Sequence, residues 1–438
     1  MAEFSPENLV ELALRKGATR ADALVKEEEI RLFRLSSKGP LPLRLVRTLR
    51  GILRVQREGR LLSLSMTPSK DLKNRVEELC RRLLSSPALK DPPLPPLSQL
   101  ALPATELSLF DETVPRLWSG EMESFFSEAK EGAYSLDGRI VSLSGEGEAR
   151  VAQTSFATSL GHRASYGSTL TRVDLFAKAI SGDREGVGTF HSHHRFWRGN
   201  ERGETLGALT GQRAVDSLQS LPAPKGEHPL LLSPPAASSL FGFWMKSLLA
   251  DASLPLGSVV ASPLISVTDS PLFPGGVRSR PFDDEGLYCR KTTLVEKGIL
   301  KNRLTDSACA GRDALPFTAS AWEEEGRMIV SPSNLSLQPG REEEAELLKG
   351  VGRGFWITGL SAEPLLGSLS SSSLWWAHGF WVEPGAPALP VEPFLLRLVP
   401  SPLLHGLVAL GKEIDRNRSF TPAPALLMER GTNLGGLR

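Results

Sequence analysis

The segment from Phe190 to Trp197 contains three histidines, residue types that can bind a transition metal. On an extended strand His191 and His193 share one face, while His194 points to the other. Two neutral imidazoles can bind Zn²⁺, but a catalytic site also needs a third ligand and a general base from elsewhere in the chain. The segment therefore allows two interpretations: a metal site on His191 and His193, or a polar strand near an interface.

Three consecutive carboxylates and a glycine form a second candidate, Asp283, Asp284, Glu285 and Gly286, with Arg280 just before them. The carboxylates could bind a cation or the amine of a peptide. Alternatively, the glycine supplies a positive φ and the aspartates cap a turn before the next strand. We favour the turn, and we keep all five residues as peptide-binding or structural candidates.

Other reactive or bulky side chains fit structural roles better. Three cysteines, Cys80, Cys289 and Cys309, are too few and too widely spaced for a disulfide framework, and no CxxC pair suggests a zinc knuckle. Cys80 lies at helical spacing among apolar residues, so we expect it to pack in a core. The remaining histidines are isolated, and a group of tryptophans could line a peptide groove but is more often buried. These are His162, His228, His378 and His405, and Trp375, Trp376 and Trp381.

The elements that position these residues differ between the two halves of the chain. In the N-terminal half, helical periodicity with a Ser5-Pro6 start predicts a helix ending at Gly17 and further helices over about 70–84, 120–134 and 203–220. Period-two alternation predicts strands over 22–34, 41–66 and 138–180. Prolines predict a stiff connector over about 87–103 and a second break at 222–235.

The C-terminal half is expected to be mainly strands joined by tight turns. A hairpin over 292–301 turns at Lys297 and Gly298, and two strands begin with Gly-Phe-Trp at Gly354 and Gly379. Helices are expected at about 236–250, 342–350 and 403–413. The class is α+β: an N-terminal mixed α/β domain over 1–222, followed by a largely antiparallel β-sheet or barrel domain over 223–438.

Composition limits the classes of partner and location. Lys plus Arg number 51 and Asp plus Glu 50, so the chain of 438 residues has a net charge of +1. This balance argues against general attraction to nucleic acid. The N-terminus has no basic and apolar signal sequence, and no stretch gives about 20 clean apolar residues, so no membrane span is expected. With so few cysteines, a reduced, cytoplasmic setting fits best.

Residues 261–312 carry a resemblance to the TldD/PmbA family, whose older name refers to modulation of DNA gyrase. The matching stretches are Ala-Ser-Pro-Leu-Ile-Ser-Val-Thr-Asp-Ser-Pro from Ala261, Arg-Pro-Phe-Asp-Asp-Glu-Gly over 280–286, the hairpin over 292–301, and Asp306 with Ala310. The 280–286 form resembles the PmbA (TldE) branch more than the TldD branch. Further similar stretches lie at 51–60, 333–340 and 379–391.

In the TldD branch, a His-Glu-x-x-x-His helix supplies zinc ligands and a catalytic glutamate, and a cysteine near the C-terminus is another ligand. The resemblance places that helix on residues 239–248, with Gly242 and Ser247 at the histidine positions and Phe243 at the glutamate. No cysteine follows Cys309. Since none of these side chains binds zinc strongly or acts as a base, the resemblance implies no catalytic residue, metal or cofactor in this chain.

The resemblance to PmbA implies a non-catalytic subunit that forms a heterodimer with a TldD-like zinc peptidase and helps to hold an unfolded peptide, by backbone pairing with a sheet edge. A homodimer stays open, and proteolysis is expected only within a complex. The family has an aromatic-Arg segment without a metal role at 196–198. Its Ile-Ala-Gly-Asn-Leu segment falls on 396–400, where both the glycine and the asparagine are lost. Two alternatives remain: an independent metallohydrolase using His191 and His193, and a regulatory protein acting on DNA gyrase.

Overall fold

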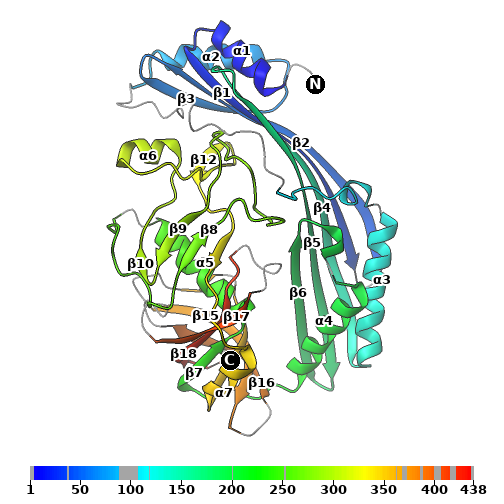
Figure 1. Cartoon of the computed structure of the whole chain (residues 1–438). Helices are drawn as coiled ribbons and strands as arrows, with labels where there is room; N and C mark the ends of the chain where they lie inside the picture. The colour runs from blue at the N-terminus through cyan, green and yellow to red at the C-terminus, as the bar shows by residue number, and fades with distance from the viewer. Residues whose placement is uncertain are drawn as a thin grey trace.

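Two curved sheets dominate the computed structural model (Figure 1). It describes residues 4–435 with the exception of 37–38, 88–106, 118, 200, 251–252, 362, 367–371, 385–387, 399–405 and 415–420. The N-terminal sheet is a half-barrel and the C-terminal sheet is a closed barrel. This is the α+β class that the sequence predicts.

The half-barrel is an antiparallel sheet of six long strands in the order β3-β2-β1-β4-β5-β6. Its strands are β1 (Arg20–Ser36), β2 (Gly39–Arg57), β3 (Arg60–Met66), β4 (Ile140–Thr158), β5 (Arg163–Ser181) and β6 (Arg184–His194). Glu58 and Gly59 join β2 to β3 with φ of 51° and 71°. Two successive positive φ angles are typical of the tight turns that match the strand twist of a hairpin.

Four α-helices cover the face of this sheet that points away from the closed barrel (Figure 1). They are α1 (Pro6–Arg15), α2 (Leu72–Leu83), α3 (Ser119–Leu136) and α4 (Gly203–Leu218); short 3₁₀ turns lie at Val114–Arg116 and Trp197–Gly199. Strand alternation explains the coverage, because Val173, Leu175 and Ala177 of β5 are buried beneath α3 and α4. The alternate residues of β5 face the closed barrel.

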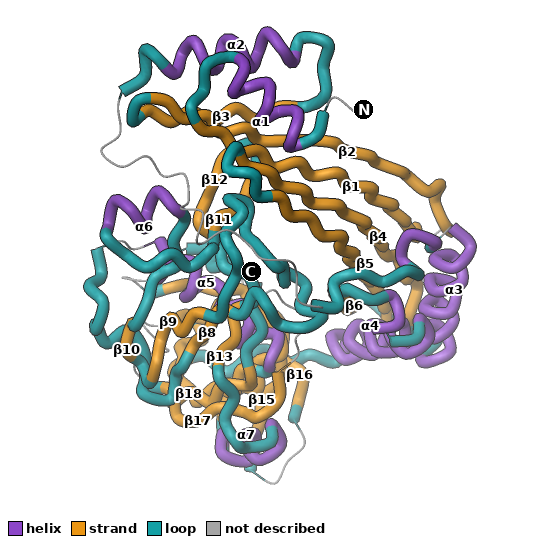
Figure 2. Tube along the Cα trace, turned by 45° about the horizontal axis from the view of Figure 1, so that its top comes forward, coloured by secondary structure: helices purple, strands orange, loops and turns teal. Residues whose placement is uncertain are grey.

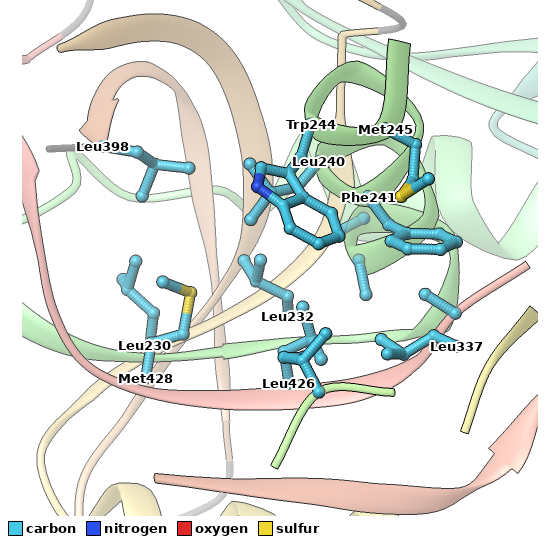
Figure 3. Packing of buried hydrophobic residues seen from close by; sticks show 14 of the residues in the cluster. Leu230, Leu232, Leu240, Phe241, Trp244, Met245, Leu337, Leu398, Leu426 and Met428 are labelled. Carbon is cyan, nitrogen blue, oxygen red and sulfur yellow. The ribbon is translucent and has the colours of Figure 1, made fainter. Parts of the chain in front are cut away.

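The closed barrel has six strands in the order β16-β15-β14-β7-β18-β17, and pairing of β16 with β18 closes it. They are β7 (Gly226–Leu232), β14 (Gly354–Leu360), β15 (Ser373–Val382), β16 (Leu389–Leu398), β17 (Leu407–Ile414) and β18 (Pro424–Asn433). Helix α5 (Pro234–Ala250) buries Leu240, Phe241, Trp244 and Met245 against Leu230 and other strand residues (Figure 3).

Smaller elements join the two sheets and extend the barrel. They are the sheet of β8 (Val267–Asp269), β9 (Thr292–Glu296), β10 (Ile299–Leu300) and β13 (Leu335–Leu337), the hairpin of β11 (Ala321–Glu324) and β12 (Arg327–Val330), and the helices α6 (Ser307–Asp313) and α7 (Glu344–Val351). The turn between β9 and β10 uses Lys297 and Gly298 with φ of 47° and 79°, as predicted. No helix among the described residues is long and apolar enough to cross a bilayer.

Two predictions about elements are wrong. The expected helix at 403–413 is strand β17 over its described part, because Leu410 pairs with Leu426 of β18 and Gly406 has a φ of +90°. Its apolar run suits either element, and tertiary pairing decides between them. The expected break at 222–235 contains β7, which lies between β14 and β18. The connector at 87–103 lies outside the described residues except for Pro87, and the boundary at 222/223 stays a prediction.

Candidate functional site

A cleft of about 810 Å³ lies between the half-barrel and the closed barrel. Strand β6 and helix α4 form one wall, and β14, β15, β16 and α5 form the other. Figure 2 shows β6 at the border of the half-barrel, beside the elements of the C-terminal half. Several residues singled out in the sequence meet here, including His191, His193, Gly242 and Phe243.

On the half-barrel wall, His191 and His193 project from the same face of β6, as strand periodicity predicts. The Nδ1 atom of His191 lies 2.9 Å from Oδ1 of Asp174, directly opposite on β5. Asp174 in turn lies 3.0 Å from Nε of Arg172. Burial lowers the pKa of His193, which favours its neutral form.

The two histidines do not complete a metal site within the part of the chain that the structure describes. No group of three or more His, Cys, Asp or Glu side chains lies close enough there to hold a metal ion. Asp174 engages His191 through Nδ1, and the same carboxylate also faces Arg172. These contacts form a row of polar side chains, from His191 of β6 to Asp174 and Arg172 of β5.

Helix α5 brings Gly242 and Phe243, two of the three positions that the resemblance assigns to the zinc helix, into the cleft wall. A Cβ atom on Gly242 would lie 2.7 Å from Oγ1 of Thr421, so a larger side chain needs that threonine to move. The Phe243 ring packs edge-on against Trp375 at 5.5 Å between centroids. Ser247 donates its hydroxyl to the carbonyl of Phe243 at 3.0 Å. These residues do not fit a zinc ion.

The barrel wall carries three ring side chains on one face of β15, Trp376, His378 and Phe380. Trp375 and Trp381 alternate with them and are buried in the barrel core. In the sequence, His378 looks isolated and the tryptophans look like one group. The signal that separates them is the period of two along this strand.

His378 sits at an irregularity of the sheet. The pairing of β15 slips beside it, both against β14 (between Ile357 and Gly359) and against β16. Its ring covers Gly359, where a Cβ atom would lie 2.1 Å from the imidazole. The ring is open to the cleft, yet the surrounding protein lowers the pKa of His378, and the charge of Arg213 lowers it further. Such bulges often re-aim a side chain at a functional site.

Helix α4 covers part of the outer edge of β6. Arg213 donates to the carbonyl of Thr189 at 2.6 Å, and Ser217 Oγ accepts from the amide of Val187 at 2.8 Å. At the opposite rim Lys246 forms an exposed ion pair with Glu363 at 2.7 Å. Charged groups therefore ring the cleft, while its β15 wall is aromatic.

The acidic turn lies outside this cleft and is buried. The Asp283 carboxylate accepts hydrogen bonds from the amides of Glu285, Leu287 and Ala321, at 3.0, 2.9 and 3.0 Å. Gly286 has a φ of +81°, and a Cβ atom there would lie 2.3 Å from the Phe156 ring. Burial raises the pKa of Asp283, and the nearby Glu285 raises it further.

The other two carboxylates of the turn bind cations of the half-barrel. Arg54 of β2 bridges Asp22 of β1, at 2.8 and 2.7 Å, and Glu285. Glu285 also accepts from the amide and the hydroxyl of Ser307, each at 2.7 Å. These contacts connect the half-barrel to the segment that carries the sequence resemblance.

Asp284 accepts from Lys26 of β1 at 2.6 Å and lies 3.4 Å from Arg280, whose guanidinium stacks on Trp322 at 3.7 Å. Burial opposes ionisation of Asp284, but Lys26 and Arg280 outweigh it and lower the pKa of that carboxyl. Arg280 is only 1% exposed. We call the turn residues Asp283 to Gly286, with Arg54 and Lys26, the buried charge tie.

The remaining singled-out residues lie apart from the cleft or beyond the described part. His228 packs edge-on against Trp381, and burial lowers the pKa of His162. Cys80 and Cys289 are buried, whereas Cys309 is half-buried. His405 lies outside the described residues. Residues 396–398 belong to β16, and 399–400 are not described.

The chain is similar in sequence to metalloproteases of the PmbA and TldD type. Residues 225–433 match the family model of the PmbA/TldA metallopeptidase C-terminal domain. The chain is 30% identical over 208 residues to a metalloprotease of Methanothermobacter thermautotrophicus, covering 43% of this chain and 45% of that protein. It is 23% identical over 350 residues to a metalloprotease PmbA homologue of Buchnera aphidicola, covering 77% and 75%. The match thus spans less than half the length of the first relative.

Solved structures share the whole fold. A candidate modulator of DNA gyrase from Thermotoga maritima has a TM-score of 0.84 at 22% identity, over 98% of both chains. TldE from Thermococcus kodakarensis has a TM-score of 0.81 at 17% identity, covering 98% of this chain and 99% of that one. At these identities the similarity establishes the fold.

Proposed function

The chain belongs to the TldD/PmbA family, and on that premise we propose that it is a non-catalytic subunit that binds extended peptides beside a zinc-carrying TldD-like subunit. The observation that carries this proposal is the α5 wall of the cleft. Gly242 and Phe243 occupy cleft positions where the family's zinc helix would present its ligand and base. Thr421 fills the space next to Gly242. Such a cleft can hold a peptide, but its described residues do not supply the zinc-bound water that the family's peptidases use.

Peptide binding is supported by the edge of β6. The amide of Val187 and the carbonyl of Thr189 point away from β5, since α4 side chains bond to both. In an antiparallel ladder the main-chain groups of alternate residues share one side, so those of His191 point the same way. An extended peptide that enters the cleft can pair with this edge at His191 without regard to its own sequence.

The test uses the full chain, alone and mixed with a TldD-like subunit from the same source. We expect no stoichiometric zinc by elemental analysis and no cleavage of an unfolded, labelled protein by the chain alone. With the partner present, we expect cleavage that a chelator abolishes, and a mixed complex on gel filtration. A homodimer that cuts peptides without the partner contradicts the proposal.

Two other outcomes would replace the proposed function. About one zinc per chain that is lost on His193→Ala would support an independent metallohydrolase. Recovery of DNA gyrase subunits from a cytoplasmic extract, without any peptidase, would support a regulatory binding protein. The proposed setting is the cytoplasm, in line with the three free cysteines.

A further inference from the structure

The β15 wall of the cleft has a feature that peptide binding alone does not require. Trp376, His378 and Phe380 follow one another at every second residue and all line the cleft. We propose that this face selects extended peptides with apolar or aromatic side chains at alternating positions, and that the His378 imidazole hydrogen-bonds the peptide backbone between them. This inference rests on the proposed function and names its substrate class.

The spacing of the three side chains matches that of an extended ligand. Strand residues rise about 3.3 Å each, so neighbours on one face stand roughly 7 Å apart. An extended peptide has the same repeat, so its side chains at positions i and i+4 meet Trp376 and Phe380 in register. His378 lies between these rings, opposite position i+2, where its imidazole can hydrogen-bond an adjacent peptide group.

The wall is held in place before any peptide binds. The Phe380 ring stacks on Trp356 at 5.3 Å between centroids, and Nε1 of Trp356 donates to Glu344 at 2.9 Å. The main chain of Trp376 accepts from the amide of Ser361 at 2.9 Å. A preorganised surface loses less conformational freedom on binding, which favours selectivity.

The surroundings of this wall favour apolar over charged side chains. Strand β16 contributes Pro390, Val391 and Pro393 to the cleft, and β6 contributes Val187. The two prolines have no amide hydrogen to offer to a ligand. A charged side chain placed beside these four residues would lose water to apolar neighbours, which disfavours it there.

The protonation of His378 supplies an independent readout. The titratable and charged groups lining the cleft around it are Arg213 and Asp216 of α4, His191 and His193 of β6, and Lys246 and Glu363 at the rim. The pKa of His378 is lowered from 6.5, so the ring is neutral at pH 7. Protonation at lower pH adds a second cation near Arg213, which opposes the binding of an apolar peptide.

The first experiment needs no variant. Fluorescence anisotropy is used to compare two labelled ten-residue peptides of the same composition, one with leucine and serine in alternation and one with its leucines in a single block. We expect the alternating peptide to bind roughly tenfold more tightly, the gain from burying about one further leucine side chain. Its affinity should be constant from pH 8 to pH 7 and fall as the pH drops below 6.5. Equal affinities, or a pH-independent affinity, overturn the inference.

Variants locate the effect on the wall. Trp376→Ala or Phe380→Ala should each weaken the alternating peptide roughly tenfold, by loss of one aromatic contact. The His378→Gln variant keeps a hydrogen-bonding group but cannot be protonated. Its affinity for the alternating peptide should be close to that of wild type at pH 7 and should not fall at lower pH. His228→Gln is the matched control, because His228 packs on Trp381 of the same barrel outside the cleft; it should keep the wild-type pH profile.

Failure of the inference can be told from failure of the proposed function. If peptides bind, but leucine spacing has no effect on affinity and His378→Gln keeps the wild-type pH profile, only the selectivity is wrong. If no peptide binds to the chain, alone or in its complex, both are wrong. Circular dichroism melts of each variant show whether a lost affinity reflects a lost fold.

Discussion

The buried charge tie and the cleft both contain ionisable side chains, but these are buried and bonded in the tie and exposed in the cleft. In the tie, Asp283, Asp284 and Glu285 are buried and receive hydrogen bonds from amides, cations and a hydroxyl of the protein itself. In the cleft, His191 and His378 are exposed to a cavity of about 810 Å³. The three carboxylates of the turn are thus already bonded within the protein, while the histidines of β6 and the ring side chains of β15 face the cavity.

This contrast separates two effects of mutation. A change in the tie should reduce stability, because it leaves buried charges without partners. A change in the cleft wall should reduce binding and leave the fold intact, because water can fill the space. Four substitutions test this separation.

Arg54→Ala is expected to have the largest effect. It removes the cation that Asp22 and Glu285 share in the buried charge tie, which should lower the free energy of unfolding by about 3–5 kcal/mol. Urea unfolding followed by circular dichroism measures this. The control is Arg15→Ala, which removes an exposed pair with Glu11 on α1 and should leave the midpoint unchanged. A loss below about 1 kcal/mol for Arg54→Ala would show that the tie contributes little.

Gly286→Ala is expected to cost about 2–4 kcal/mol, from a strained positive φ and a Cβ atom only 2.3 Å from the Phe156 ring. Gly257→Ala is the matched control. Gly257 has a φ of +90° but no atom within 4 Å of the new Cβ, so it should cost only about 1 kcal/mol. The same unfolding assay compares the two, and equal losses would mean that the Phe156 contact is unimportant.

Asp284 should make stability sensitive to acid. Its folded pKa is lowered, so its contribution is fully present above the ordinary value of 3.8 and is lost as the pH falls through the lowered value. Asp284→Asn should therefore be less stable than wild type at pH 7, and the difference should shrink below pH 3.8. Unfolding midpoints measured from pH 7 to pH 2.5 test this. A constant difference would show that Lys26 and Arg280 do not stabilise the ionised form.

Gly359→Ala should have the smallest effect on stability and a clear effect on binding. The new Cβ would lie 2.1 Å from the His378 ring, which can swing into the cleft at a cost below about 1 kcal/mol. The affinity for the alternating peptide should fall several-fold, as measured by anisotropy. Gly311→Ala on α6 has open space around the new Cβ and should change neither quantity. A large stability loss in Gly359→Ala would remove the distinction between cleft and tie.

Sequence reasoning predicted the long periodic elements well and the short ones poorly. The strands over 22–34 and 138–180 and the helices near 120–134 and 203–220 are present because their apolar residues repeat at one period over many positions. The helix predicted at 403–413 is a strand, since Leu407 to Leu410 fits either period and pairing with β18 decided. The short α6 and the hairpin of β11 and β12 had too few residues to show a period.

What the sequence alone determined is local: the family motif over 261–312, the alternation of β15, and the absence of histidine and glutamate at Gly242, Phe243 and Ser247. The burial of Asp283 to Glu285 under Lys26 and Arg54, and the shared cleft of His191 and His378, come from tertiary packing. The physical reason is distance along the chain. Motif and period depend on neighbouring residues, whereas burial and the assembly of a cleft depend on which strands of two separate sheets come to lie against each other.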